Sequence, residues 1–166
     1  MKNHDLQFLQ SELSRVSEWV QFADKKAGFI AVFYSAIFGF LWTQKEDILA
    51  RVLNGAGIWG WIYTAVAVTT LILIFIGLYF LYATVCPRLK NGNTDRSLFY
   101  FGNVAKMKIE DYLKDVEKMT EDEACRQVAE QIHTNSVIAN AKMNSVKKGT
   151  QVLLATGISL LILILI

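Results

Sequence analysis

One stretch of the chain carries no charged side chain for thirty-six residues, from Val52 to Pro87. Its densest part, residues 58–86, reads IWGWIYTAVAVTTLILIFIGLYFLYATVC. A helix needs about 20 apolar residues to cross the hydrocarbon layer of a bilayer. Tryptophans near one end and tyrosines near the other suit the aromatic belts of the two interfaces. A buried helix of a soluble protein is the competing interpretation, but it would be unusually long and uncharged. The stretch therefore predicts a transmembrane helix.

Two further charge-free segments, residues 27–43 and 149–166, are long enough to cross. Each gives about 25 Å of helix. The first is at the short end of what can span, so a re-entrant segment is its alternative. We predict an all-α, three-span helical membrane protein with a small cytoplasmic helical bundle. Its segments are an amphipathic helix at 1–26, transmembrane helices at 27–43, 58–86 and 149–166, an extracytoplasmic connector at 44–57 and a cytoplasmic helical region at 87–148.

The basic residues predict the orientation. Lysine and arginine number 4 in residues 1–26 and 11 between Arg88 and Lys148, but only 2 in the connector. Cytoplasmic loops carry the excess of basic residues, so the N-terminus and the 87–148 region are expected in the cytoplasm. Cys86 and Cys125 form no disulfide framework, which suits a reducing compartment. No cleavable signal peptide is evident.

Apolar residues recur with heptad spacing along two polar segments. The first seam is Leu6, Leu9, Leu13, Val16, Val20, Ala23 and Ala27, and the second is Cys125, Val128, Ile132, Asn135, Ala139, Lys142 and Val146. Such seams pack either within one subunit or against another copy, and the second option predicts a homo-oligomer. A helix is also expected from about Val104 to Met119. Thr120 and Glu123 form a capping box that begins a last helix, which we expect to run unbroken to Ile166.

No catalytic chemistry is evident in the chain. His4 and His133 lack partners at metal-ligand spacing, and neither cysteine belongs to a Cys-x-x-Cys pair, so we expect no enzyme, no metal site and no cofactor. The segment Gly55-Ala-Gly57-Ile-Trp-Gly60 matches the dinucleotide pattern GxGxxG, but no strand precedes it, and we interpret it as a flexible turn. The net charge of +2, with no basic run interleaved with aromatics, argues against a nucleic-acid partner.

Charged residues gather where each predicted span meets the cytoplasm: Asp24, Lys25 and Lys26, then Arg88 and Lys90, then Lys142, Lys147 and Lys148. One interpretation is anchoring to anionic lipid. The other is a pocket for an anionic ligand, or a pore vestibule. Asn135 and Lys142 on the second seam, with Gln131 beside them, favour the pocket slightly, because a buried polar group needs a partner.

Four short motifs carry a family resemblance. They are Ala23-Asp24-Lys25-Lys26-Ala27-Gly28, Pro87-Arg88-Leu89, Ser97-Leu-Phe-Tyr-Phe-Gly102, and Gln131-Ile132 followed by Ser136, Ile138 and Lys142. Together they resemble the transmembrane effector family of Pycsar antiphage systems (PycTM). The resemblance implies a bacterial inner-membrane protein that a cyclic pyrimidine mononucleotide (cUMP or cCMP) gates, so that the membrane is impaired and infection is aborted. We expect no appended soluble sensor domain, so sensing would use the small helical region.

The candidate ligand-binding residues are Lys25, Lys26, Arg88, Gln131, Asn135 and Lys142, with Asp24 and Pro87 as gating or structural residues. The expected partners are the lipid bilayer, the cyclic mononucleotide and further copies of the chain. Two other interpretations remain open. One is a constitutive, holin-like oligomeric pore, and the other is a non-conducting scaffold that docks a partner protein.

Overall fold

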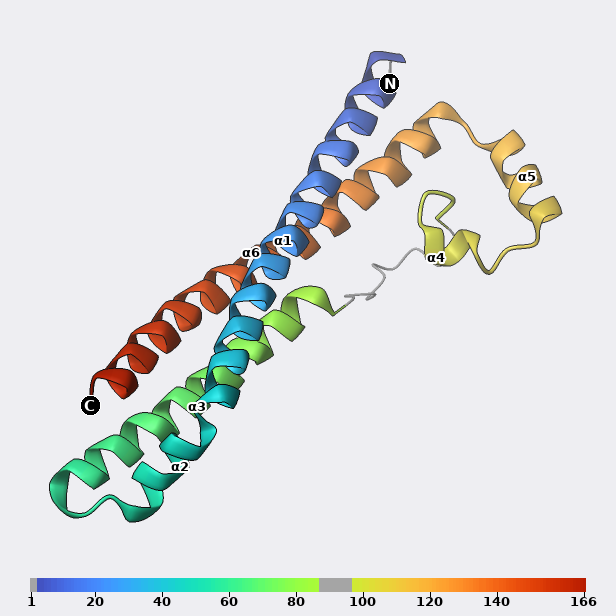
Figure 1. Cartoon of the computed structure of the whole chain (residues 1–166). Coiled ribbons are helices and arrows are strands. Elements are labelled where there is room, and N and C mark those ends of the chain that lie inside the picture. The colour runs from blue at the N-terminus through green and yellow to red at the C-terminus, as the bar shows by residue number, and fades with distance from the viewer. Residues whose placement is uncertain (1–2, 87–96) are drawn as a thin grey trace. The chain divides into compact units, whose positions relative to one another are not determined.

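The structure is a computed structural model, and it describes residues 3–86 and 97–166. Within these ranges the chain forms helices and no strand, which confirms the prediction of an all-α fold. The elements in chain order are α1 (Asn3–Thr43), α2 (Lys45–Asn54), α3 (Gly57–Val85), α4 (Phe101–Val104), α5 (Ile109–Lys118) and α6 (Glu121–Leu165) (Figure 1).

The chain divides into two compact units. The head unit comprises Met1–Phe22 and Pro87–Ala141, and the span unit comprises Ala23–Cys86 and Lys142–Ile166. Helices α1 and α6 each contribute residues to both units, and neither helix is interrupted at the boundary.

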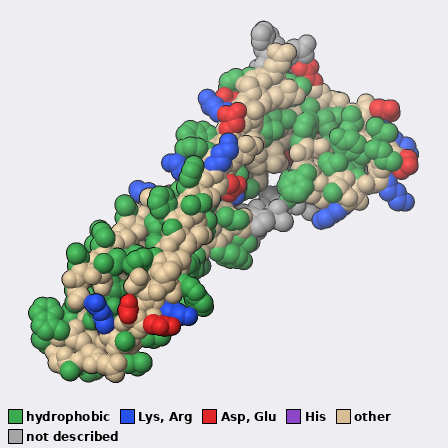
Figure 2. Space-filling model, viewed as in Figure 1, with side chains coloured by type: hydrophobic (Ala, Val, Ile, Leu, Met, Phe, Trp, Pro, Cys, Tyr) green, Lys and Arg blue, Asp and Glu red, His purple; other side chains and the backbone are tan. Residues whose placement is uncertain are grey.

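Among the described residues, three helices are long and apolar enough to cross a membrane, as predicted: α1, α3 and α6. Helix α3 has 29 residues and is about 43 Å long, so its ends reach beyond the hydrocarbon layer. Trp59 and Trp61 near its start and Tyr79 and Tyr82 near its end are exposed, as expected of side chains at the two interfaces. Toward the α2 end, the side chains seen in Figure 2 are mainly hydrophobic, apart from a small group of charged ones.

Helix α2 lies within residues 44–57, for which the sequence predicts only a connector. Glu46 and Asp47 lie in its first turn and Arg51 in its last, which suits the helix dipole at both ends. The GxGxxG segment then turns the chain into α3. Gly57 has φ +70°, which only glycine adopts readily, and a Cβ on Gly60 would lie 2.5 Å from the Gly55 carbonyl. The glycines therefore close a tight helical hairpin.

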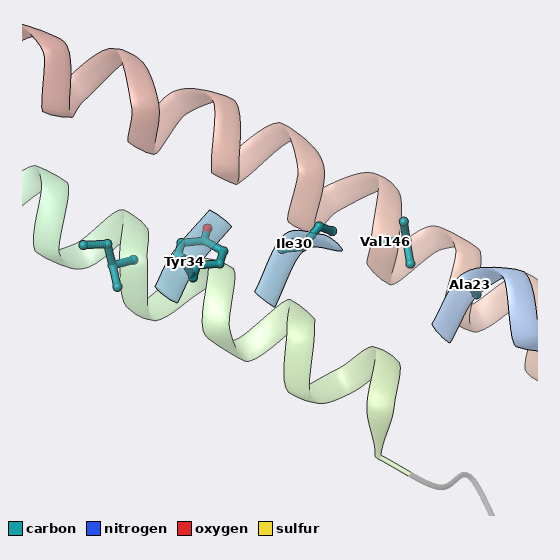
Figure 3. Close-up of a cluster of buried hydrophobic side chains, with 5 residues drawn as sticks. Ala23, Ile30, Tyr34 and Val146 are labelled. Carbon is teal, nitrogen blue, oxygen red and sulfur yellow. The ribbon is translucent and has the colours of Figure 1, made fainter. Parts of the chain in front are cut away.

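The core of the span unit lies between α1, α3 and α6. Its buried cluster is Ala23, Ile30, Tyr34, Ile74 and Val146 (Figure 3). The Tyr34 side chain packs against Gly77, which has no side chain. A Cβ added to Gly77 would lie 1.7 Å from the Tyr34 hydroxyl oxygen. Thr70 on α3 and Ser159 on α6 share a buried hydrogen bond of 2.8 Å. Small residues thus admit large neighbours, and hydroxyls link the helices.

In the head unit, both predicted seams lie on the covered side of their helices. Leu6, Leu9, Leu13, Val16 and Val20 are half-buried, whereas Phe8 and Trp19 are exposed. On α6, Cys125, Val128 and Ala139 are buried, and Ile132 and Asn135 are half-buried. The seams are therefore covered within a single chain.

The predicted capping box begins α6. The Thr120 N–H donates to Glu123 Oε2 at 3.1 Å, and the Glu123 N–H donates to Thr120 Oγ1 at 3.3 Å. Hydrogen bonds from the Thr120 N–H and from the Thr120 side chain lower the pKa of the Glu123 carboxyl.

The helix expected from Val104 begins later, at Ile109. Residues 105–107 form turns, including a Met107 N–H bond to the Val104 carbonyl at 3.1 Å, and Lys108 is extended. Glu110 and Asp111 occupy the first turn of α5, a placement that the helix dipole favours.

Candidate functional site

An ion pair joins α1 and α6 at the first residues of the span unit. Lys142 Nζ donates to Asp24 Oδ1 at 2.5 Å. The Lys142 side chain is only 8% exposed, while that of Asp24 is 45% exposed. An ammonium group buried to this degree needs a partner, and Asp24 supplies it. Asp24 faces solvent on one side, so the carboxylate of the pair is accessible while the ammonium is covered.

Small buried residues surround the pair. Ala23 is 0% and Ala27 1% exposed, on either side of Asp24 along α1. On α6, Gly149 lies two turns beyond Lys142, and a Cβ there would contact Phe80 at 3.4 Å and Ile30 at 3.7 Å. Such residues let helix backbones approach closely. Asp24 and Lys142 therefore lie on a tightly packed contact between helices.

The other predicted cations of the span unit remain on its surface. Lys25 and Lys26 are exposed on α1, and Lys147 and Lys148 are exposed on α6. The Lys148 ammonium lies 5.9 Å from the centre of the Phe80 ring, a cation–π contact. This end of the span unit thus carries five lysines and one aspartate. The α2 end carries two cations and two acids: Lys45, Glu46, Asp47 and Arg51.

Two further predicted ligand residues lie in the head unit and pair with each other. Gln131 Nε2 donates to Asn135 Oδ1 at 3.1 Å, one turn apart on α6. Both side chains are half-buried. The pair leaves one amide N–H of Gln131 and the amide group of Asn135 with donor capacity for a base edge. The remaining predicted residues, Pro87 and Arg88, lie outside the residues that the structure describes.

A polar cavity in the head unit was not anticipated. It has a volume of about 260 Å³ and is lined by Leu98, Asp115, Lys118, Met119, Glu123 and Gln127. Gln127 Oε1 accepts the Leu98 N–H at 2.9 Å, so the SLFYFG segment is tied to α6. No local sequence pattern marks this cavity, because its lining comes from Leu98, from the end of α5 and from the start of α6. Its lining holds two carboxylates and one ammonium, which makes it a poor site for an anion alone.

Residues 8–166 match the family model of the Pycsar effector protein domain, PycTM. The chain belongs to this family. No curated protein and no solved structure matches it.

Membership confirms the family that the four motifs indicated. A PycTM protein is a transmembrane antiphage effector, and the three long apolar helices agree with a membrane location. Two of the motifs now have structural roles. The Asp24 segment supplies one half of the ion pair, and the SLFYFG segment binds α6 through Gln127.

Proposed function

We propose that this PycTM effector is a gated membrane protein of the bacterial inner membrane. A cyclic pyrimidine mononucleotide, cUMP or cCMP, binds the cytoplasmic helical region, residues 87–148, and shifts the membrane-spanning helices to a state that impairs the membrane, which aborts infection. The observation that carries the proposal is the continuity of α1 and α6. Each helix belongs to both units without a break, so a change in the head unit acts directly on helices of the span unit.

The Asp24–Lys142 pair provides a switching element for this proposal. A ligand shifts an equilibrium only by the difference in its affinity for two states. In the resting state, Lys142 is satisfied by the Asp24 carboxylate. In the activated state, the ligand phosphate replaces that carboxylate at Lys142, with Lys25 and Lys26 as further cations. Arg88 suits the phosphate best, because a guanidinium forms two parallel hydrogen bonds.

We further propose that the active form is a homo-oligomer. Three spans leave little room for a conducting path within one chain. Because the heptad seams are covered within the chain, the contact between copies falls instead on exposed apolar side chains such as Phe8, Trp19 and Val137.

Dye leakage from proteoliposomes tests the proposed gating, with cUMP, cCMP, cAMP and cGMP each added to the full chain. We expect a pyrimidine nucleotide to release the dye. Arg88→Ala and Lys142→Met should each raise the required dose about tenfold to a hundredfold, since each loses a hydrogen bond between charged groups. Lys106→Ala, which removes an exposed lysine of the head unit, is the matched control.

Three outcomes contradict the proposal in different ways. Leakage that no nucleotide changes would favour a constitutive pore. A chain that never leaks but co-purifies with another protein would favour a scaffold. If Arg88→Ala and Lys142→Met both leak at the wild-type nucleotide dose, the protein is still gated, but these two residues do not bind the phosphate.

A further inference from the structure

The span unit contains an apolar groove near α2, on the side opposite the Asp24–Lys142 pair. Its volume is about 370 Å³. Four helices line it: Leu41 from α1; Lys45, Ile48 and Leu49 from α2; Ala67, Val68, Thr70, Leu71 and Ile74 from α3; and Leu163 from α6. The α3 residues lie in the middle third of that helix, so the groove reaches the depth of the hydrocarbon layer.

Nearly all of the groove wall is hydrocarbon. Thr70 contributes a hydroxyl, but it is already bonded to the Val66 carbonyl and to Ser159. Lys45 supplies the single charge among the lining residues. Its ammonium lies 4.2 Å from the centre of the Trp42 ring, and Trp42 is exposed as an interfacial side chain would be. The groove thus has a long apolar floor and one cation at the interface.

We infer that this groove binds one anionic phospholipid, with an acyl chain along the α3 wall and the headgroup phosphate at Lys45. Exposed walls at Leu49, Val68 and Leu71 leave the groove open to the surrounding bilayer. An unfilled apolar groove would forfeit dispersion contacts along its lining, and an acyl chain restores them. A helix from a second copy would fill the apolar part but leave Lys45 without a counter-charge, whereas a phosphate supplies one.

Native mass spectrometry of the full chain tests this inference. The protein is reconstituted in vesicles of equal parts phosphatidylglycerol and phosphatidylcholine, extracted in detergent, and measured with its retained lipid. The wild type should retain phosphatidylglycerol in preference to phosphatidylcholine by about fivefold, the size expected for one lysine near an anionic headgroup. Lys45→Gln should retain both lipids equally. Val68→Trp, which fills the groove from an exposed wall, should retain neither.

Arg51→Gln is the matched control, because Arg51 is on the same helix but does not line the groove. It should keep the wild-type preference. Equal losses in Arg51→Gln and Lys45→Gln would show a general interfacial charge effect and overturn the inference. So would a wild type without bound lipid, a Lys45→Gln variant that keeps the preference, or lipid retention in Val68→Trp.

The same spectra report the number of copies. If the wild type retains no lipid and Val68→Trp changes the number of copies in the complex, the groove is a contact between copies instead. Circular dichroism checks that each variant is helical. If Val68→Trp does not fold, Leu49→Trp on the opposite exposed wall replaces it, with the same expected loss of both lipids.

Discussion

The Tyr34 hydroxyl lies where a side chain on Gly77 would have to go, so these two residues fix how α1 meets α3. Gly77→Ala places a methyl group 1.7 Å from that oxygen, and Tyr34 must leave its position. We expect a loss of about 1–3 kcal/mol in the free energy of unfolding, the usual cost of overpacking. Thermal or denaturant unfolding in detergent, followed by circular dichroism, measures it.

Gly39→Ala is the control for this substitution. It also replaces a helical glycine, but nothing lies within 4 Å of its added Cβ, so it should gain about 1 kcal/mol from helix propensity. Tyr34→Leu should partly rescue Gly77→Ala by freeing the space beside Gly77. If Gly77→Ala and Gly39→Ala have the same free energy of unfolding, the Tyr34 side chain can move away from Gly77 without loss of stability.

The ion pair between Asp24 and Lys142 is expected to contribute both to stability and to the resting state. Asp24→Asn keeps the shape of the side chain but leaves a buried ammonium without a carboxylate. Because Asp24 is nearly half exposed, we expect a loss of about 1–3 kcal/mol, between the values for surface and buried pairs. We also expect leakage without ligand, if the pair holds the resting state. Unfolding and proteoliposome leakage measure the two effects.

Glu117→Gln, which removes an exposed acid near the end of α5, should change neither. Adding Lys142→Met to Asp24→Asn should restore stability, because no buried charge is then left unpaired. If Asp24→Asn unfolds with the wild-type free energy and does not leak without ligand, the ion pair does not hold the resting state.

Among the elements, the α2–α3 hairpin depends on close backbone contact between Gly55 and Gly60. Gly60→Ala places a Cβ 2.5 Å from the Gly55 carbonyl, an atom that cannot rotate away. We expect the hairpin to open, with faster hydrogen exchange across α2 than in the wild type. Gly57→Ala should have a smaller effect of about 1–2 kcal/mol, the cost of a left-handed backbone for a residue with a Cβ.

Gly157→Ala on α6 serves as the control, since its added Cβ meets no atom within 4 Å. Its exchange across α2 should match that of the wild type. If Gly60→Ala also exchanges at the wild-type rate across α2, the close contact between Gly55 and Gly60 is not what holds the hairpin closed.

At the scale of the whole molecule, the uneven charge of the two ends of the span unit predicts its orientation. Five lysines gather at the Asp24 end, while the charges at the α2 end balance. The positive-inside rule then places the Asp24 end and the head unit in the cytoplasm. In a chain with Cys86→Ser and Cys125→Ala, a cysteine at exposed Lys106 should resist membrane-impermeant reagents in intact cells, and one at exposed Asn54 should react. The reverse pattern would invert the topology.

The sequence predicted the features that depend on one segment alone. The spans follow from the absence of charge, the covered side of α6 from residues such as Val128 and Ala139, and its first turn from Thr120 and Glu123. Features that depend on which helix faces meet were missed. The Tyr34–Gly77 contact, the Thr70–Ser159 bond and the partner of Lys142 each need the tertiary pairing of helices. Helix α2 was missed although Ile48, Leu49, Val52 and Leu53 recur with helical spacing, because ten partly charged residues between two spans also suit an irregular connector.

The unbroken path of α6 through the boundary at Ala141 and Lys142 also limits how such a protein can be rebuilt. A different sensing module cannot be grafted there at an arbitrary length, because each residue inserted into a helix turns everything beyond it by about 100°. Seven added residues would return Lys142 to within about 20° of its face. Two would turn it by about 200°, away from Asp24. Chimaeras at this boundary should therefore be viable in steps of whole heptads.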